Sequence, residues 1–428
     1  MTGGTVSTAG MRGFLRVRVG GLPRPFWVLW SGTLVNRLGT MVQPFLAFYL
    51  SGARGMSVTA TGSVLAVIGI GGTVSQLIGG FLTDRIGRRA TLTVGMLATG
   101  AVMLGLGYAR DLWLIVVTAL LLGLTVDLFR PAAQSIVADL VPVADRPRAF
   151  GILLWAINLG FSVAMVLGGV LARDGYQLLF WIDALTGMLF GLLVWRAVPE
   201  TRARVADHQS GRFADVLGDR VMVCFAILVL ACALVFLQAF STLPLAMRAA
   251  GLSPSAYGLV VATNGIVIIA VQPLVGHRLG RWDPSRTLAG GMLGIGVGYG
   301  LTSLVSSTAG YAATVVVWTL GEIVVHTVAA VIVATLAPAH LRGRYNGLYG
   351  TAWGVAALAA PLLGTTMLQL GTVPLWSGCL GLCAAAAIGQ LALGPAIRDR
   401  ATVTAASGGP DVRTVAVPGE DGPAAGPA

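Results

Sequence analysis

The chain has 428 residues, of which 56% are hydrophobic and 11% charged, with a formal net charge of +11. A mean hydropathy of +0.82 excludes a soluble globular domain. Apolar runs of about 20 residues recur along the chain, and each is long enough to cross a hydrocarbon core about 30 Å thick as a helix. Because the runs are continuous rather than alternating, they predict membrane-spanning helices and not a β-barrel.

The positive charge first suggests nucleic acid as a partner. All 28 basic residues are arginines, however, and they gather in the short loops between the apolar runs. Such a pattern indicates membrane topology, so we exclude nucleic-acid binding. Arginine in place of lysine, together with abundant Ala, Gly and Val, is typical of a GC-rich genome, and we therefore expect a bacterial protein in the cytoplasmic membrane.

Residues 1–25 form an arm that carries four arginines and has no apolar core before Pro23, so no cleavable signal peptide is expected. A polar segment at 198–220 reads as a cytoplasmic linker between two six-helix halves, 26–197 and 221–394. Residues 395–428 are rich in Gly, Pro and Ala and are expected to be a disordered cytoplasmic tail. The twelve predicted spans are 26–50, 60–83, 90–109, 112–138, 149–172, 177–197, 221–245, 255–276, 287–306, 311–336, 345–369 and 373–394.

The arginines also predict the orientation. Of the 28, 22 lie in the arm, the linker, the tail and the loops on their side of the membrane, whereas 4 lie on the other side. The four are Arg54, Arg110, Arg173 and Arg248. Because cytoplasmic loops carry the excess of basic residues, both termini and the linker are expected in the cytoplasm.

The two halves repeat with an offset of 196 residues. The segment Val137-Ala138-Asp139-Leu140-Val141-Pro142 maps onto Val333-Ala334-Thr335-Leu336-Ala337-Pro338, and Gln76, Gly80 and Arg85 map onto Gln272, Gly276 and Arg281. The fold class predicted is therefore an all-α integral membrane protein, with twelve transmembrane helices in two parallel six-helix repeats around a central cavity. Substrate sites in such folds lie near the midplane between the repeats.

A charged run separates the second and third spans, and it reads Gly80-Phe81-Leu82-Thr83-Asp84-Arg85-Ile86-Gly87-Arg88-Arg89. It is too short and too polar to lie in lipid, so it must be a tight turn, which Gly87 permits. The run resembles the loop motif Gly-x-Leu-x-Asp-Arg-x-Gly-Arg-Arg of the major facilitator superfamily of secondary transporters. Gly80, Leu82, Asp84, Arg85, Gly87, Arg88 and Arg89 all match it.

That resemblance implies a conformational latch formed by Gly80, Asp84, Arg85, Gly87, Arg88 and Arg89. In the family, the acidic residue contacts the start of helix 11 when the cytoplasmic side is closed, which here is near Tyr345-Asn346-Gly347. A carboxylate at a helix N-terminus is favourable by about 0.3–1 kcal/mol. The copy in the second half, Gly276-His277-Arg278-Leu279-Gly280-Arg281, lacks the acid. Anchoring of the arginines at the membrane surface is the alternative explanation.

Ionisable residues inside the spans are costly and are therefore candidates for function. Asp127 and Arg130 are spaced i, i+3 and Glu322 and His326 i, i+4, so each pair shares a helix face. Arg37 lies in the first span. We expect these five residues to serve proton coupling or substrate binding, and Glu322 above all, because burial disfavours its charged form. A fixed Glu322–Arg37 ion pair is the alternative for Glu322. A structural ion pair is the alternative for Asp127 and Arg130, and a packing role the alternative for His326. Asp183 is expected to be structural.

The fifth span carries Gly160, Gly168 and Gly169, which resemble the helix-5 motif of drug-exporting members, although Ala164 and Met165 replace its Gly-Pro pair. Small residues at this spacing also serve close helix packing. The four cysteines lie within apolar runs without a His or carboxylate nearby, so they are expected to be packing residues and no metal is predicted.

Segments 129–142 and 321–345 resemble multidrug-efflux-type members of the superfamily. This resemblance, together with the aromatic residues in the spans, favours proton-coupled export of small lipophilic molecules. Those aromatic residues are Trp30, Phe45, Trp155, Phe236 and Trp353. A symporter or facilitator is the alternative on the same fold, with Arg37 and Arg130 holding an anionic group. A membrane enzyme or a non-transporting sensor is disfavoured. The expected partners are a small-molecule substrate, protons and the lipid bilayer, with no cofactor, and the chain is expected to be a monomer.

Overall fold

The computed structural model describes residues 21–142, 145–200, 216–279, 282–338 and 341–406, and within these ranges the regular structure is helical. Among these described residues, eleven helices are long and apolar enough to cross a membrane. The first predicted span provides the twelfth membrane-spanning segment. It is interrupted at Thr40 and Met41, between α2 (Arg24–Gly39) and α3 (Val42–Phe48). The prediction of an all-α, twelve-helix membrane protein is confirmed.

After α3 and a π-helical turn at Tyr49–Ala53, the first half continues in chain order with α4 (Val58–Ile86), α5 (Arg88–Tyr108), α6 (Leu112–Val126), α7 (Phe129–Leu140), α8 (Arg146–Leu171) and α9 (Gln177–Ala197). Local capping supports these boundaries. The Ser57 hydroxyl accepts the Ala60 N–H at 3.2 Å at the start of α4. Gly87, at φ +99°, ends α4 in a conformation that side chains rarely adopt.

The second half comprises α11 (Arg220–Phe236), α12 (Gln238–Ser241), α13 (Leu243–Ala249), α14 (Pro254–Leu279), α15 (Pro284–Leu301), a 3-10 turn (Thr302–Leu304), α16 (Thr308–Leu336), α17 (Arg342–Leu370) and α18 (Thr372–Ala406). One predicted boundary is wrong. Residues 395–406, which the composition predicts to be part of a disordered tail, are helical and extend α18. The remainder of that predicted tail, 407–428, lies outside the described residues, as do residues 201–215 of the linker.

The 196-residue offset reappears in the helix boundaries. The α6–α7 span, Leu112–Leu140, maps onto α16, Thr308–Leu336, and the starts of α2, α5 and α8 map onto those of α11, α15 and α17. Each half also breaks its first span at the same place, because Met41, which precedes α3, corresponds to Leu237, which precedes α12. One difference stands out: α6 and α7 are separated at Asp127, whereas α16 is continuous.

The halves meet mainly along two helix pairs, α4 with α17 and α8 with α14, and α3 also contacts α12 and α13. Glycines bring the backbones together. A Cβ on Gly62 would lie 2.9 Å from the Pro361 carbonyl oxygen, and one on Gly265 would lie 2.9 Å from that of Asn158. Gly62 and Gly69 in α4 correspond to Gly258 and Gly265 in α14 under the repeat offset. We call these four glycines the seam glycines; close approach of this kind drives helix association in lipid.

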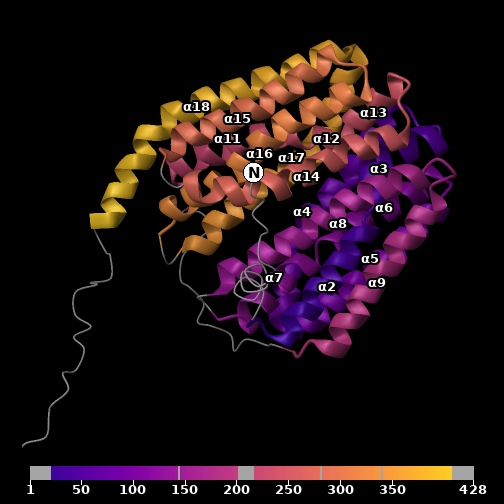
Figure 1. Cartoon of the computed structure of the whole chain (residues 1–428), viewed down its shortest axis with the longest axis horizontal. Coiled ribbons are helices and arrows are strands. Elements are labelled where there is room, and N and C mark those ends of the chain that lie inside the picture. The colour runs from indigo at the N-terminus through magenta and orange to yellow at the C-terminus, as the bar shows by residue number, and fades with distance from the viewer. Residues whose placement is uncertain (1–20, 143–144, 201–215, 280–281, 339–340, 407–428) are drawn as a thin grey trace, which may run out of the picture.

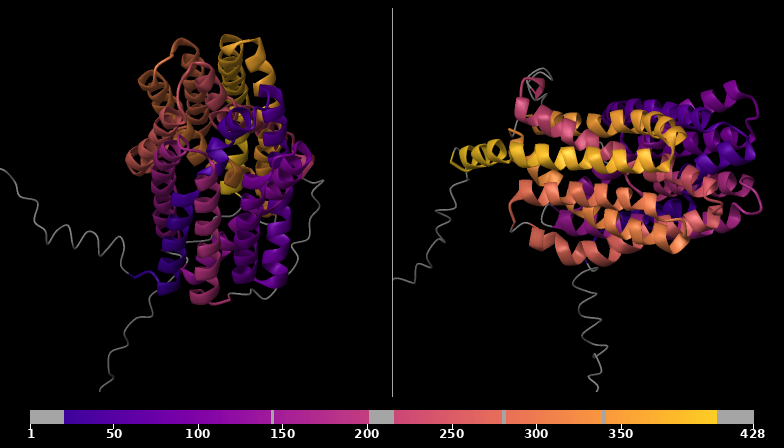
Figure 2. Two further views of the ribbon diagram at one scale, coloured as in Figure 1. Left: turned by 90° about the vertical axis from the view of Figure 1, so that its right-hand side faces the viewer. Right: turned by 90° about the horizontal axis from the view of Figure 1, so that it is seen from above.

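The contact between the two halves, which we call the seam, does not extend over their whole length. We call the end of the molecule that carries the 84–89 loop and residues 198–220 the linker end. The halves lie together at the opposite end and diverge towards the linker end, where the end of α18 and α7 lie apart (Figures 1 and 2). At the opposite end, Ser255 of α14 donates to the Gly169 carbonyl at 2.6 Å. Towards the linker end, a Cβ on Gly80, Gly151 or Gly350 would meet no atom within 4 Å.

Candidate functional site

Glu322 lies in the middle of α16 and is only 7% exposed. Its Oε2 accepts a hydrogen bond from the Asn264 amide of α14 at 2.5 Å, and the same amide nitrogen donates to Thr319 at 3.0 Å. A buried carboxylate needs such donors, because leaving it unpaired costs several kcal/mol. Asn264 therefore holds Glu322 in place from the neighbouring helix.

His326 lies one turn further along α16, with its Nε2 4.0 Å from Glu322 Oε1. Its side chain is 47% exposed, whereas that of Glu322 is 9% exposed. The imidazole stacks on Trp353 of α17 with 5.1 Å between ring centroids, and Phe236 of α11 packs edge-on at 6.1 Å. The exposed imidazole and the buried carboxylate are therefore adjacent, and aromatic rings from α11 and α17 pack against the imidazole.

Asn264 did not emerge from the sequence, because a single amide in an apolar run carries no pattern. Its signal is positional: it directly precedes the seam glycine Gly265, which the repeat offset relates to Gly69. A Cβ on Gly265 would lie 2.9 Å from the Asn158 carbonyl oxygen of α8. The residue that binds Glu322 thus lies next to a glycine at the contact between the two halves.

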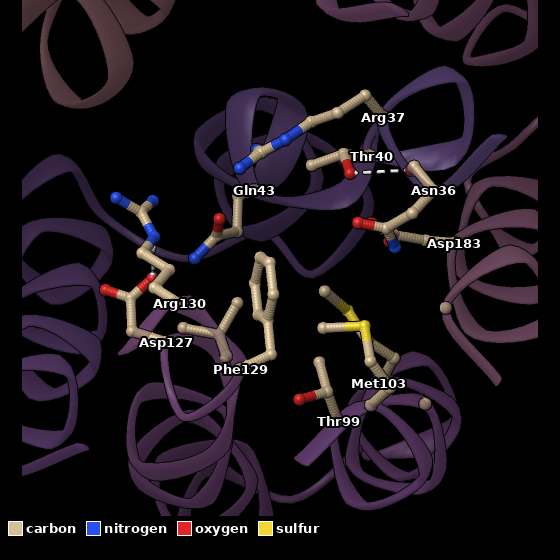
Figure 3. A pocket seen from close by; sticks show the side chains of 14 residues that line it. Asn36, Arg37, Thr40, Gln43, Thr99, Met103, Asp127, Phe129, Arg130 and Asp183 are labelled. Carbon is tan, nitrogen blue, oxygen red and sulfur yellow. Dashed lines mark hydrogen bonds and ion pairs between the residues drawn. The ribbon is translucent and has the colours of Figure 1, made fainter. Parts of the chain in front are cut away.

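The other predicted candidates gather in the first half. Figure 3 shows Arg37 of α2, Asp127 and Arg130 around one cavity, with Asp183 of α9 on the same wall as Asn36. Arg130 Nε lies 2.7 Å from Asp127 Oδ1, so the predicted i, i+3 ion pair is present. It forms where α6 ends and α7 begins. Asp183 accepts the Val42 N–H at 3.1 Å and so caps α3 at the break in the first span, in keeping with its expected structural role.

The Glu322–Arg37 ion pair considered as an alternative is not formed in this structure. The described partners of Glu322 are Asn264 and His326, both from the second half. Arg37 lines the cavity of the first half, and its Nε is buried without a hydrogen-bond partner among the described residues. The two groups of candidates therefore occupy separate positions in the two halves.

The charged loop is braced within the first half. Arg88 Nε lies 2.8 Å from Asp139 Oδ2 at the end of α7. The backbone N–H groups of Arg88 and Arg89 donate to Glu200 Oε1 at 2.7 and 3.2 Å, so this carboxylate caps α5. The Arg89 guanidinium lies over Trp195, 4.6 Å from the ring centroid, and that of Arg85 lies 5.7 Å from Phe81. Glu200, in the linker, was not predicted to take part.

The side chain of Asp84 lies outside the described residues, so the latch stays a prediction. Its expected contact, Tyr345 at the start of α17, donates here to Asp219 Oδ2 at 2.6 Å. Arg400 of α18 also pairs with Asp219, which caps α11 through the Val221 N–H at 3.0 Å. Burial raises the pKa of Asp219, but these hydrogen bonds outweigh it and hold the pKa below its usual value. This cluster joins three helices at the linker end.

The helix-5 glycines have separate contacts. Gly160 and Gly168 face the first span, where a Cβ would lie 2.6 Å from Arg37 Cβ and 2.9 Å from the Phe45 ring, respectively. Gly169 faces α14, where a Cβ would lie 2.9 Å from the Pro254 carbonyl oxygen. The motif therefore packs α8 against its own half and, at the opposite end, against the other half.

Comparisons with known proteins agree with this architecture. A family model described as the Major Facilitator Superfamily matches residues 29–361 and 225–411. The chain is 26% identical to the uncharacterized MFS-type transporter YqjV of Bacillus subtilis, over 76% of this chain and 82% of that protein. It is 23% identical to a Na(+), Li(+), K(+)/H(+) antiporter of Planococcus maritimus, over 79% and 90%. It is 24% identical to the multidrug resistance protein MdtH of Cronobacter sakazakii, over 76% and 83%.

Among solved structures, the peptide-transporter-family protein PepTSo superimposes with a TM-score of 0.75 at 14% sequence identity, covering 89% of this chain and 99% of that one. This likeness shows the fold, and the family model matches most of the chain. The prediction of a major facilitator superfamily member, which the 80–89 loop suggested, is thereby confirmed. The chain belongs to the major facilitator superfamily of multi-pass membrane transporters.

Proposed function

We propose that this transporter exports small lipophilic molecules across a bacterial cytoplasmic membrane, by alternating access and in exchange for protons. In this proposal the linker end faces the cytoplasm, as the arginine distribution indicates. The structure then represents the state that is open to the cytoplasm. Two relatives at low identity carry names in keeping with the proposal, one a cation/proton antiporter and the other a multidrug resistance protein.

The observation that carries the proposal is the Glu322–Asn264 contact with His326 beside it. A hydrogen bond to a charged carboxylate contributes about 1.5–3 kcal/mol, against about 0.5–1.5 kcal/mol for a neutral pair. Protonation of Glu322 therefore weakens its hold on Asn264. Asn264 directly precedes the seam glycine Gly265 in α14, and in this proposal a shift of α14 on release of Asn264 alters the contact between α14 and α8. The arrangement gives a proton a physical means of biasing the equilibrium between the two open states.

The lining near His326 suits lipophilic cargo. Phe236 lies 5.7 Å from Trp353 and 6.2 Å from Phe240, and Phe240 lies 6.3 Å from Phe161 of the other half, all between ring centroids. Aromatic faces bind flat apolar molecules through burial and stacking. This cluster spans both halves, as a substrate site in an alternating-access transporter must.

Everted membrane vesicles that contain a pH-sensitive dye test the proposal. In energised vesicles, adding a lipophilic compound that the chain transports releases protons from the lumen if the chain is an antiporter. A symporter gives the opposite sign, because cargo entering de-energised vesicles carries protons inward. Glu322→Gln is expected to abolish the proton signal, and Glu200→Gln, a carboxylate outside the membrane core, to retain it. If Glu322→Gln exports as well as the wild type with a proton gradient as the only energy source, the coupling role is wrong.

A further inference from the structure

The cavity of the first half contains an arginine, Arg37, that forms no ion pair among the described residues. Of the two acidic residues that line it, Asp127 is bound to Arg130 at 2.7 Å and Asp183 to the Val42 N–H at 3.1 Å. Arg37 takes part in neither contact, and its Nε is shielded from solvent and has no hydrogen-bond partner among the described residues. In Figure 3 its guanidinium extends towards Gln43, away from Asp183.

Such an arginine is costly inside a membrane. Ionisable groups in spans pair with one another, with backbone carbonyls or with cargo. The guanidinium presents a planar fork of donors that matches a carboxylate in a bidentate geometry. A second guanidinium, that of Arg130, lines the same cavity, where Asp127 pairs with its Nε at 2.7 Å.

The lining has two characters. Thr40 and Gln43 supply polar groups on the side of Arg37, whereas Met96, Met103 and Phe129 supply an apolar wall. The cavity has a volume of about 40 Å³, which accommodates a small polar group but not a whole drug-sized molecule. The Arg130 side chain is 54% exposed, so the cavity is reached from the space on that side. A ligand would place its charged group in the cavity and leave its body outside.

We propose that this cavity binds the carboxylate of a small amphipathic organic anion, with Arg37 as the principal ligand and Arg130 as a secondary one. The inference rests on the proposed transport function and narrows its cargo, from lipophilic molecules in general to those that carry one carboxylate. The apolar body of the anion lies against Phe129 and extends towards the central space between the halves.

Equilibrium binding to the purified full-length chain in lipid nanodiscs tests this, without relying on proton coupling. The probes are acetate, benzoate, 3-phenylpropionate and octanoate, each compared with its neutral primary amide. The wild type is expected to bind at least one of the larger carboxylates about 10-fold or more tightly than its amide. Arg37→Gln is expected to remove that preference, Arg130→Gln to reduce it by less, and Arg110→Gln, an exposed arginine in the loop after α5, to leave it unchanged.

The proposal is overturned if no carboxylate in the series binds better than its amide, or if Arg37→Gln keeps the preference. Thermal unfolding without ligand, compared among the three variants, identifies a variant that has lost its fold. If Arg37→Gln is that variant, Arg37→Lys replaces it; lysine keeps the charge but not the planar fork of donors, so it should lower the preference for carboxylate over amide. If a carboxylate binds better than its amide but Glu322→Gln exports as well as the wild type, proton coupling alone is rejected. If Glu322→Gln abolishes the proton signal but no carboxylate binds better than its amide, the carboxylate site alone is rejected.

Discussion

Gly69 is the seam glycine at which an added methyl group has the most definite consequence. A Cβ there would lie 2.5 Å from the Ala357 carbonyl carbon and 2.7 Å from the Leu358 nitrogen, both backbone atoms of α17. Backbone atoms of a packed helix cannot rotate away as a side-chain tip can. In Gly69→Ala, α4 and α17 must therefore separate whenever the seam is closed at this level.

The free-energy cost of this clash applies only to the conformation in which α4 and α17 are in contact at Gly69. Overpacking costs about 1–3 kcal/mol, which corresponds to roughly a 5- to 150-fold change in a two-state ratio. The state open at the linker end should lose population by this factor, provided that the other state opens the seam at Gly69. The helix propensity gained from Gly to Ala, about 1 kcal/mol, acts on both states and cancels.

Distances between spin labels at Phe150 in α8 and Leu274 in α14 measure the opening at the linker end. Both residues are exposed, at 37% and 65%, and the labels require a chain whose four native cysteines have been replaced. Gly69→Ala should shift the distance distribution towards shorter values. Gly290→Ala in α15, where a Cβ would meet nothing within 4 Å, is the matched control and should leave it unchanged. An unchanged distribution in Gly69→Ala would refute the two-state account of the seam.

Two further predictions concern the polar clusters. Asn264→Ala leaves Glu322 buried without its amide donor, so it should shift the pH profile of transport and destabilise the protein by about 1–3 kcal/mol. Thr319→Val is the control and should have smaller effects on both. An unshifted pH profile in Asn264→Ala would show that Asn264 takes no part in the coupling. Asp219→Ala should lower thermal stability more than Tyr345→Phe, because it removes the α11 cap as well as the hydrogen bonds of Tyr345 and Arg400. Since the pKa of Asp219 is lowered in the folded protein, its contribution to the free energy of unfolding should be complete at pH 5–8 and be lost only as pH falls through that lowered pKa. Equal melting temperatures of Asp219→Ala and wild type at pH 7 would contradict this.

Hydropathy and the internal repeat were sufficient for the architecture. The offset of 196 residues placed the α16 boundaries on those of the α6–α7 span, because each boundary follows from where polar residues meet the membrane surface. The helical extension of α18 through residues 395–406 was missed, since its Gly, Pro and Ala composition resembles a disordered tail. In the structure, Arg398 of that extension binds Asp283 at 3.1 Å and Arg400 binds Asp219, and such distant contacts leave no local pattern.

The site was predicted in part for the same reason. Ionisable residues in apolar runs are conspicuous, and Asp127, Arg130, Glu322 and His326 form the pairs that their helical spacing implied. Which helix supplies the partner of Glu322 depends on packing between α14 and α16, so Asn264 could not be identified from spacing within one helix. Glu200 was likewise missed, because its capping of α5 joins segments more than a hundred residues apart.

The central claim is that the protonation state of Glu322 sets the balance between the two open states. The Phe150–Leu274 label distance, followed from pH 5.5 to pH 8 in wild type, Glu322→Gln and His326→Gln, tests it without knowledge of the cargo. The account predicts a distance distribution that changes with pH in the wild type and is independent of pH in Glu322→Gln, which stays neutral throughout. A pH dependence in Glu322→Gln equal to that of the wild type would contradict it.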